Sequence, residues 1–476
     1  MVTATGLVLL AATLAVFAWV GFRARGGAED LEEYTTARNS QGVTALGLSF
    51  FASGMGAWIL FAPPEVGAGV GLVAALGYAI GAAAPLVAFA LLGGRLRAVA
   101  PRGHGLTEFV RLRFGRTFHA YVVAISILYM LVFVTAELTA VGAVAAITAG
   151  IAPWVATVGV AAVTLAYTAY GGLRASLRTD RWQAWLVVVL LAIGVVAVLS
   201  GVRDAPGALT RSGLLGVDAI GVQAAVTLVI AIVAANLFHQ GYWQRVFAAR
   251  STRALTGGAG VAMAVTAPVV AVAGVLGIVA AGSGLDLGSP PVPFFALMAT
   301  VPVWVNLGVL VLGLSLVASS VDTLENGLAS LVVSERPSMD VGAARAVTVV
   351  LVLPALAVAL QGYSVLRLFL IADLLCAATV VPAMLGLWSR ATTGAALVGA
   401  VAGLVGAVAP GWVTTGSLVQ GAVLATFPQD VPTLPPFAGA VLASSVVAVA
   451  GSLLSRRTTD LAGLGARIPT LERTRA

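Results

Sequence analysis

The chain has 476 residues, of which 60% are hydrophobic and 9% are charged, and its mean hydropathy is +1.03. This composition excludes a soluble globular protein and predicts an integral membrane protein. The formal charge of +7 indicates arginine kept on the cytoplasmic side of a membrane, and nucleic acid is not implied as a partner. The single cysteine, Cys376, lies in an apolar run, which excludes an intrachain disulfide.

Apolar runs long enough to cross a hydrocarbon layer of about 30 Å recur from end to end. The first run has Arg23 and Arg25 behind it and no basic segment before it, so it is interpreted as a retained helix and not as a signal peptide. We predict an all-α integral membrane protein with thirteen transmembrane helices, near 4–22, 43–70, 71–94, 118–149, 153–171, 182–202, 217–238, 256–282, 303–332, 342–361, 363–388, 392–409 and 434–454.

The arginines predict the orientation of these helices. With the C-terminus inside, the inner loops and the tail hold 23 of the 26 arginines, whereas the outer loops hold Arg203 and Arg211, and Arg367 lies at a helix end. Positive residues collect on the cytoplasmic side. We therefore expect a multi-pass protein of the cell membrane with its N-terminus outside and its C-terminus in the cytoplasm.

Ten of the thirteen helices divide into two sets of five. A set with an odd number of helices that is repeated once must be inverted in the membrane, as in LeuT-like transporters with a binding site at the midplane. We expect one transmembrane domain over residues 1–476. Its parts are a first helix with an inner loop (1–42), repeat one (43–202), repeat two (217–390), two extra helices (391–454) and a tail with little structure (455–476).

The second predicted helix carries Gly54 and Gly56 at mid-span, followed by Pro63 and Pro64. Such residues release backbone carbonyls and amides, which a cation or a polar solute can then satisfy inside the membrane. The alternative is close packing between helices at small residues. The pattern alone leaves both interpretations open.

Polar residues are concentrated in the ninth predicted helix. Charged residues inside a span are costly and are expected to face the bundle interior or water, and neighbouring hydroxyls form a hard-oxygen site for a small cation. Two further carboxylates, Glu137 and Asp373, lie at membrane depth, where they could relay protons, act as counter-ions or pair structurally. The polar residues of the ninth helix are Ser315, Ser319, Ser320, Asp322, Thr323, Glu325 and Asn326.

Three stretches resemble the sodium:solute symporter family, which includes proline and sugar symporters. They are FFASGMGAW (50–58), TLAYTAYGGLRASLRTDRWQAW (164–185) and FHQGYWQR (238–245), and the similarity extends over roughly residues 34 to 390. The inner stretch APRGHGLTEFVRLRFG (100–115) looks most like the urea and polyamine branch. The resemblance implies a ten-helix inverted-repeat core with extra flanking helices.

The resemblance also implies a sodium site. In the family, carbonyls at the break of the first core helix and oxygens of the eighth core helix bind the ion. Here they correspond to Ala52 and Met55, and to the carbonyl of Leu316 with the hydroxyls of Ser319 and Ser320. Such a set, without a fixed carboxylate, suits a weakly held monovalent ion that must enter and leave in each cycle.

The chain departs from the family pattern at two places. Proline transporters of the family carry an aspartate where this chain has Gly54, so the contribution of that carboxylate to ion affinity is missing or is supplied elsewhere, with Asp322 as the candidate. Sugar transporters carry a Tyr-Trp pair where this chain has Ala235 and Asn236, which argues against a stacked sugar ring. Urea, another amide or an amino acid remain possible solutes. The residues expected to contact the solute are Ser53, Gly54, Gly56, Trp58, Ala235 and Asn236.

The sequence thus predicts sodium-coupled symport of a small organic solute. One alternative is proton coupling through Asp322, Glu325, Glu137 or Asp373, since buried carboxylates can titrate near neutral pH. Another is a membrane sensor that binds a solute without moving it. We expect no enzyme, because no paired catalytic aspartates, zinc motif or supported nucleophile are present, and no cofactor beyond the coupling ion.

Overall fold

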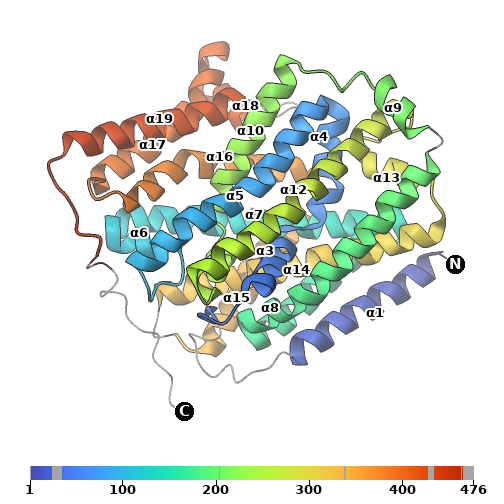
Figure 1. The fold of residues 1–476 in the computed structure, drawn as a ribbon, viewed down its shortest axis with the longest axis horizontal. Coiled ribbons are helices and arrows are strands. Elements are labelled where there is room, and N and C mark those ends of the chain that lie inside the picture. The colour runs from blue at the N-terminus through green and yellow to red at the C-terminus, as the bar shows by residue number, and fades with distance from the viewer. Residues whose placement is uncertain are drawn as a thin grey trace.

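The computed structural model describes residues 2–23, 35–202, 204–336, 339–426, 434–462 and 464. Parts of the predicted first inner loop, of the outer loop at 410–433 and of the tail lie outside these residues. Regular structure in the described part is helical, apart from one isolated bridge between Gln41 and Ala249. The long helices lie beside one another in a bundle (Figure 1).

Eleven helices are long and apolar enough to cross a membrane. They are α1 (Val2–Arg23), α5 (Leu72–Val99), α7 (Arg116–Ala149), α8 (Pro153–Gly201), α10 (Ala219–Asn236), α12 (Thr252–Gly282), α14 (Val303–Glu335), α15 (Val341–Ala359), α16 (Val365–Met384), α17 (Thr393–Thr415) and α19 (Leu434–Leu454). A twelfth span is a pair bent by 59°, in which α3 (Val43–Gly54) is followed by η1 (Ala57–Leu60) and α4 (Ala62–Val70).

Helix α8 accounts for two of the predicted spans. Its 49 residues would extend about 74 Å as one straight helix, far more than a hydrocarbon core of about 30 Å. Gly172 interrupts it with φ 59° and ψ −152°, and Tyr167 before the break and Ser176 after it both donate hydrogen bonds to Asp322. Divided at Gly172, the described residues contain thirteen spans, in agreement with the prediction. The predicted loop between 171 and 182 is wrong, because one glycine makes the turn and the helix resumes at once.

Shorter helices fill the connections that the sequence presented as loops. Two of these helices, at residues 205–211 and 293–298, begin with proline in the first helical turn. The short helices are α6 (Leu106–Phe114), α9 (Ala205–Arg211), α11 (Gln240–Ala248), α13 (Pro293–Met298), η2 (Leu385–Leu387) and α18 (Leu418–Thr426).

Two helices are discontinuous in the middle of the bundle. The backbone pairing of α3 ends where the Met55 N–H bonds the Phe51 carbonyl at 2.9 Å, and the chain resumes at Ala57. Likewise α10 ends at Asn236 and α11 begins at Gln240. Glycine lies near the first break, and polar residues lie near the second. Each interruption frees backbone N–H and C=O groups, which is tolerated inside a membrane only where other groups satisfy them.

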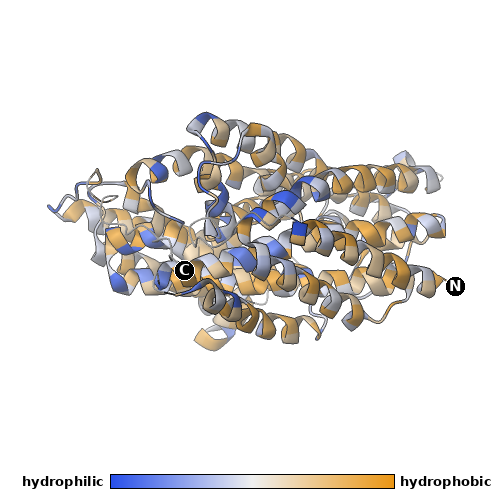
Figure 2. Cartoon of the chain, turned by 90° about the horizontal axis from the view of Figure 1, so that it is seen from below, coloured by the Kyte–Doolittle hydropathy of each residue, from blue (hydrophilic) through white to orange (hydrophobic). Residues whose placement is uncertain are grey.

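The outside of the bundle is apolar. Helix α1 packs on α8 at one edge, and α17 and α19 pack on each other at the opposite edge (Figure 1). Large apolar side chains point outward, as Trp154 and Val413 do with 60% and 80% of their surface exposed. Hydrophobic residues run along the helices, and many hydrophilic ones lie at helix ends and in the connections (Figure 2). This surface suits lipid, so the polar chemistry lies within the bundle.

Candidate functional site

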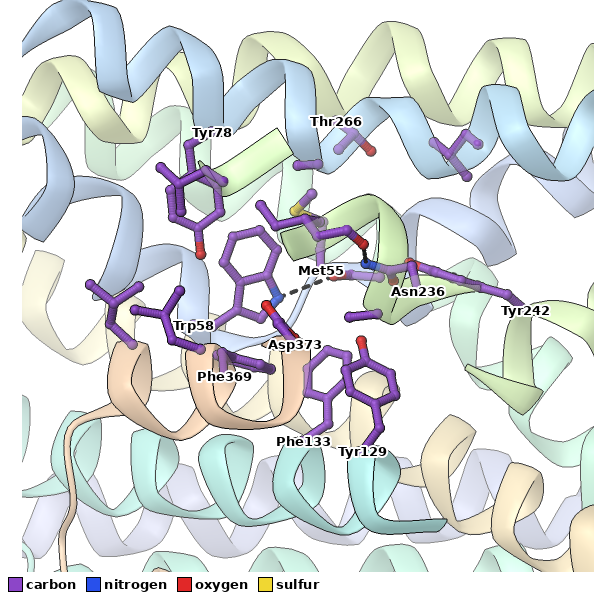
Figure 3. A pocket seen from close by; sticks show the side chains of 18 of the residues that line it. Met55, Trp58, Tyr78, Tyr129, Phe133, Asn236, Tyr242, Thr266, Phe369 and Asp373 are labelled. Atoms are coloured by element: carbon purple, nitrogen blue, oxygen red, sulfur yellow. Dashed lines mark hydrogen bonds between the residues drawn. The ribbon is translucent and has the colours of Figure 1, made fainter. Parts of the chain in front are cut away.

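A cavity lies where the two helix breaks meet (Figure 3). Its volume is about 60 Å³. This is several times the roughly 10–15 Å³ that one water molecule needs. Its wall is dominated by aromatic side chains from six helices. These are Phe50, Trp58, Tyr78, Tyr129, Phe133, Tyr242 and Phe369.

Hydrogen bonds and ring contacts fix this wall. Trp58 donates its indole N–H to the Gly54 carbonyl at 3.1 Å and stacks on Tyr78, with ring centroids 5.6 Å apart and planes 10° apart. Asn236 donates its side-chain amide to the Ile232 carbonyl at 2.8 Å (Figure 3). These contacts hold Trp58, Tyr78 and Asn236 in place on the cavity wall.

Glu137 of α7 occupies the break of α3. It accepts a hydrogen bond from the Ala57 N–H at 2.8 Å, and so caps the start of η1. A Cβ built on Gly56 would lie 1.9 Å from the Oε1 atom of Glu137, so glycine is required for this approach. That Oε1 has no hydrogen-bond partner among the described residues.

A fully buried ion pair joins four helices, α3, α8, α11 and α14. Asp180 of α8 accepts hydrogen bonds from Arg245 of α11 at 2.7 Å, from Ser49 of α3 at 2.6 Å and from Ser319 of α14 at 2.8 Å. Arg245 also donates to the Thr323 hydroxyl at 2.9 Å. Asp180 therefore links α3, which ends at the first break, to the serine pair of α14 (Ser319 and Ser320) through Ser319.

The carboxylates of α14 also face α8, beside this ion pair. Asp322 accepts hydrogen bonds from Tyr167 and Ser176 at 2.7 Å each and from Thr179 at 3.1 Å. Glu325 accepts one from Thr164 at 3.0 Å. Asp322 therefore clamps the two halves of α8 around Gly172.

The five predicted sodium residues lie on two neighbouring elements. Ala52 and Met55 are at the end of α3, and Leu316, Ser319 and Ser320 are on α14, which packs against α3 and η1. The Ser320 hydroxyl bonds back to the Leu316 carbonyl at 3.2 Å, whereas Ser319 donates to Asp180. All the predicted ligands offer oxygen, which fits a hard monovalent cation.

Of the residues predicted to contact the solute, Gly54, Trp58, Ala235 and Asn236 line the cavity. Ser53 and Gly56 do not: the Ser53 hydroxyl bonds back to the Ser49 carbonyl, and Gly56 packs against Glu137.

At Gly54 a Cβ would lie 2.1 Å from the Tyr242 hydroxyl, so this tyrosine fills the space that a side chain at position 54 would need. Met55, predicted as a sodium ligand through its carbonyl, also contributes to the cavity wall.

Asp373 differs from the other predicted carboxylates. It lines the cavity, while Glu137, Asp322 and Glu325 face the α3 break or α8. The sequence grouped all four as coupling candidates because depth in the membrane was the only signal available.

Several residues of the site were missed from the sequence. Asp180 and Arg245 lie in the stretches 164–185 and 238–245, which resemble the family. No local sequence pattern shows that these two residues, 65 positions apart, form an ion pair. Tyr78 and Tyr129 gave no signal, because single aromatic residues in apolar helices are common.

Comparisons with known proteins agree with this architecture. Residues 34–281 match the Sodium:solute symporter family. The chain is 31% identical over 362 residues to the spermidine transporter DUR31 of Candida albicans, which covers 75% of this chain and 70% of that protein. It is 26% identical over 188 residues to the urea active transporter of Saccharomyces cerevisiae, covering 37% of this chain and 24% of that one.

Solved structures show the fold. A Na⁺-coupled sialic acid symporter in an outward-open state superposes with a TM-score of 0.74 at 14% identity, covering 95% of this chain and 98% of that one. Mhp1, a nucleobase-cation-symport-1 family transporter, gives 0.57 at 15% identity, covering 93% and 99%. MhsT gives 0.55 at 12% identity, covering 87% and 98%. These neighbours confirm the predicted LeuT-like fold, and the sequence matches show that the chain belongs to the sodium:solute symporter family of transporters.

Proposed function

We propose that this transporter couples the entry of sodium to the uptake of a small organic solute by alternating access. The observation that carries the proposal is that one broken helix, α3, contributes both to the aromatic cavity and, beside the serine pair of α14, to the predicted ion site. An ion at that break would change the backbone that forms the cavity wall. Coupling then requires only that ion and solute favour the same conformation.

In this proposal sodium binds at Ala52, Met55, Leu316, Ser319 and Ser320. Hydroxyls and carbonyls hold sodium without a permanent negative ligand, so the ion can be released on the inner side. Asp180 lies one hydrogen bond from Ser319 and orients that hydroxyl. Each sodium that enters at a membrane potential of about 100 mV contributes roughly 2.3 kcal/mol, enough for about fiftyfold accumulation of an uncharged solute.

The solute binds in the aromatic cavity, in contact with Gly54, Trp58, Ala235 and Asn236. The names of the two sequence relatives point to nitrogen-containing solutes, a polyamine in one case and urea in the other. The size of the cavity supports a small molecule. We place the protein in the cell membrane with its N-terminus outside, on the strength of its arginine distribution.

The test is uptake by purified protein in liposomes. Radiolabelled spermidine, urea and proline are offered under an inward sodium gradient, an equal potassium gradient and an inward proton gradient. We expect accumulation of one solute above its equilibrium level with sodium only. Solute that binds but is never accumulated under any of these gradients would contradict transport and support the membrane sensor.

Proton coupling is the second candidate, and one observation favours it. Glu137 lies at the break of α3 with one carboxylate oxygen that lacks a hydrogen-bond partner among the described residues. A proton on that oxygen would change how Glu137 contacts the backbone at the α3 break, which is where the proposed sodium ligands Ala52 and Met55 also lie. Uptake that persists without sodium, collapses with the pH gradient and is lost in Glu137→Gln would establish this mechanism.

A further inference from the structure

The strongest unassigned chemistry in the bundle is the single carboxylate of the aromatic cavity. Among the nineteen described residues that line the cavity, Asp373 carries the only acidic side chain, and none carries a basic one. An anionic solute would therefore meet a negative charge with nothing to compensate it. Because a buried ion is stabilised chiefly by opposite charge, the side chains that line the cavity favour a cation over an anion.

Asp373 is also without a partner. Its side chain is 5% exposed, and in the part of the chain that the structure describes no hydrogen-bond donor or basic group pairs with its carboxylate. The other buried aspartates differ, since Asp180 pairs with Arg245 and Asp322 accepts three hydroxyl hydrogen bonds. A buried carboxylate that has no protein partner and faces a cavity calls for a cationic ligand.

The walls around Asp373 have the matching chemistry. Figure 3 shows its carboxylate among the rings of Trp58, Tyr129, Phe133 and Phe369. Phe133 and Phe369, which both line the cavity, lie edge to face, with centroids 4.8 Å apart and planes 78° apart. The faces of aromatic rings are electron-rich and attract ammonium groups.

We propose that this cavity binds an organic ammonium cation, with the Asp373 carboxylate as its counter-ion and the surrounding rings as cation–π contacts. The assignment names the solute class of the proposed function and rests on it for the role of the cavity. It moves Asp373 from ion coupling to solute binding. A cavity of this size suits one ammonium group with a short chain.

The test measures binding, which does not depend on transport. Purified protein in detergent is titrated with radiolabelled putrescine and with radiolabelled choline, and bound label is competed with tetramethylammonium, urea, proline and gluconate. We expect at least one labelled amine to bind and to be displaced by tetramethylammonium, and not by urea, proline or gluconate. Failure of both amines to bind, or displacement by urea alone, would overturn the proposal.

Variants locate the site. Asp373→Asn should weaken amine binding at least tenfold, Asp373→Glu should keep part of it, and Phe369→Leu should weaken it several-fold. Asp460→Asn, which removes an exposed carboxylate, is the matched control and should bind as the wild type does. Folded Asp373→Asn with wild-type affinity contradicts the assignment. If this variant does not fold, Asp373→Glu and Phe369→Leu decide, and wild-type affinity in both contradicts it.

The two proposals fail in distinguishable ways. Amine that binds through Asp373 but is not accumulated under a sodium gradient would refute sodium symport and leave the cavity assignment standing. Sodium-driven uptake of urea by a protein that binds neither amine would refute the cavity assignment and leave symport standing.

Discussion

At the residue scale, the pair formed by Asp180 and Arg245 is fully buried. Among the described residues, the two charges are compensated by each other and by hydroxyl and carbonyl groups. Removing one member of such a pair leaves a buried charge without a partner, which is far more costly than losing the attraction alone.

We therefore expect Arg245→Gln to lower the stability of the folded protein by about 3–5 kcal/mol, because Asp180 would remain charged and unpaired. Asp180→Asn/Arg245→Gln should recover a substantial part of that loss. Thermal unfolding in detergent measures both. Arg250→Gln, at an exposed position, is the control and should change little. A double variant that is no more stable than Arg245→Gln would show that the pair is not the cause.

At the element scale, the kink of α8 and the break of α3 depend on glycines for different reasons. Gly172 adopts a backbone conformation that side chains strongly disfavour, whereas Gly56 leaves room for Glu137. Residue 172 must be glycine because of its own backbone angles. Residue 56 must be glycine because a side chain there would collide with Glu137 of the neighbouring helix α7.

Gly172→Ala should lower stability by about 1–3 kcal/mol, since alanine cannot adopt a φ of 59° and a ψ of −152° without strain. Gly194→Ala is the matched control in the same helix, because a Cβ there meets no atom within 4 Å. Thermal unfolding should show it equal to or slightly above the wild type, as alanine favours helix over glycine. Equal stability of both variants would refute the strain at residue 172.

Gly56→Ala should abolish or strongly reduce uptake, because its Cβ would displace the Glu137 carboxylate from the Ala57 N–H. Gly69→Ala lies in the same bent span, with no atom within 4 Å of the added Cβ, and should transport normally. Initial uptake rates in liposomes, normalised to folded protein, provide the measurement. Normal uptake by Gly56→Ala would show that this approach of Glu137 is not required.

The sequence predicted these elements unevenly, for physical reasons. Hydropathy reports how many residues can lie in lipid, so the spans were predicted well. The glycines and prolines near Gly54 allowed a break but left close helix packing equally open, and the resemblance to the family implied the break. Hydropathy does not report a turn made by a single residue, which is why residues 172–181 were assigned to a loop. The pairing of Asp180 with Arg245 and the assembly of the cavity depend on how distant helices pack, and no local pattern encodes that.

At the scale of the whole molecule, the orientation in the membrane remains a prediction from the arginines. The chain offers a direct test because its only cysteine, Cys376, is buried. Gly216→Cys, in a predicted outer loop, should react with an impermeant maleimide in right-side-out vesicles, whereas Arg456→Cys should react only in inverted ones. The reverse pattern would place the N-terminus inside.

The central claim is that sodium at the break of α3 and the serine pair of α14 drives uptake, and the sodium activation curve tests it most directly. Uptake is measured against sodium concentration for the wild type, for Ser319→Ala/Ser320→Ala and for Ser315→Ala, whose hydroxyl bonds only its own helix. We predict that half-maximal sodium rises about tenfold in the double variant, or ~1.4 kcal/mol, and is unchanged in the control. An unchanged activation curve in a folded, transporting double variant would contradict the account.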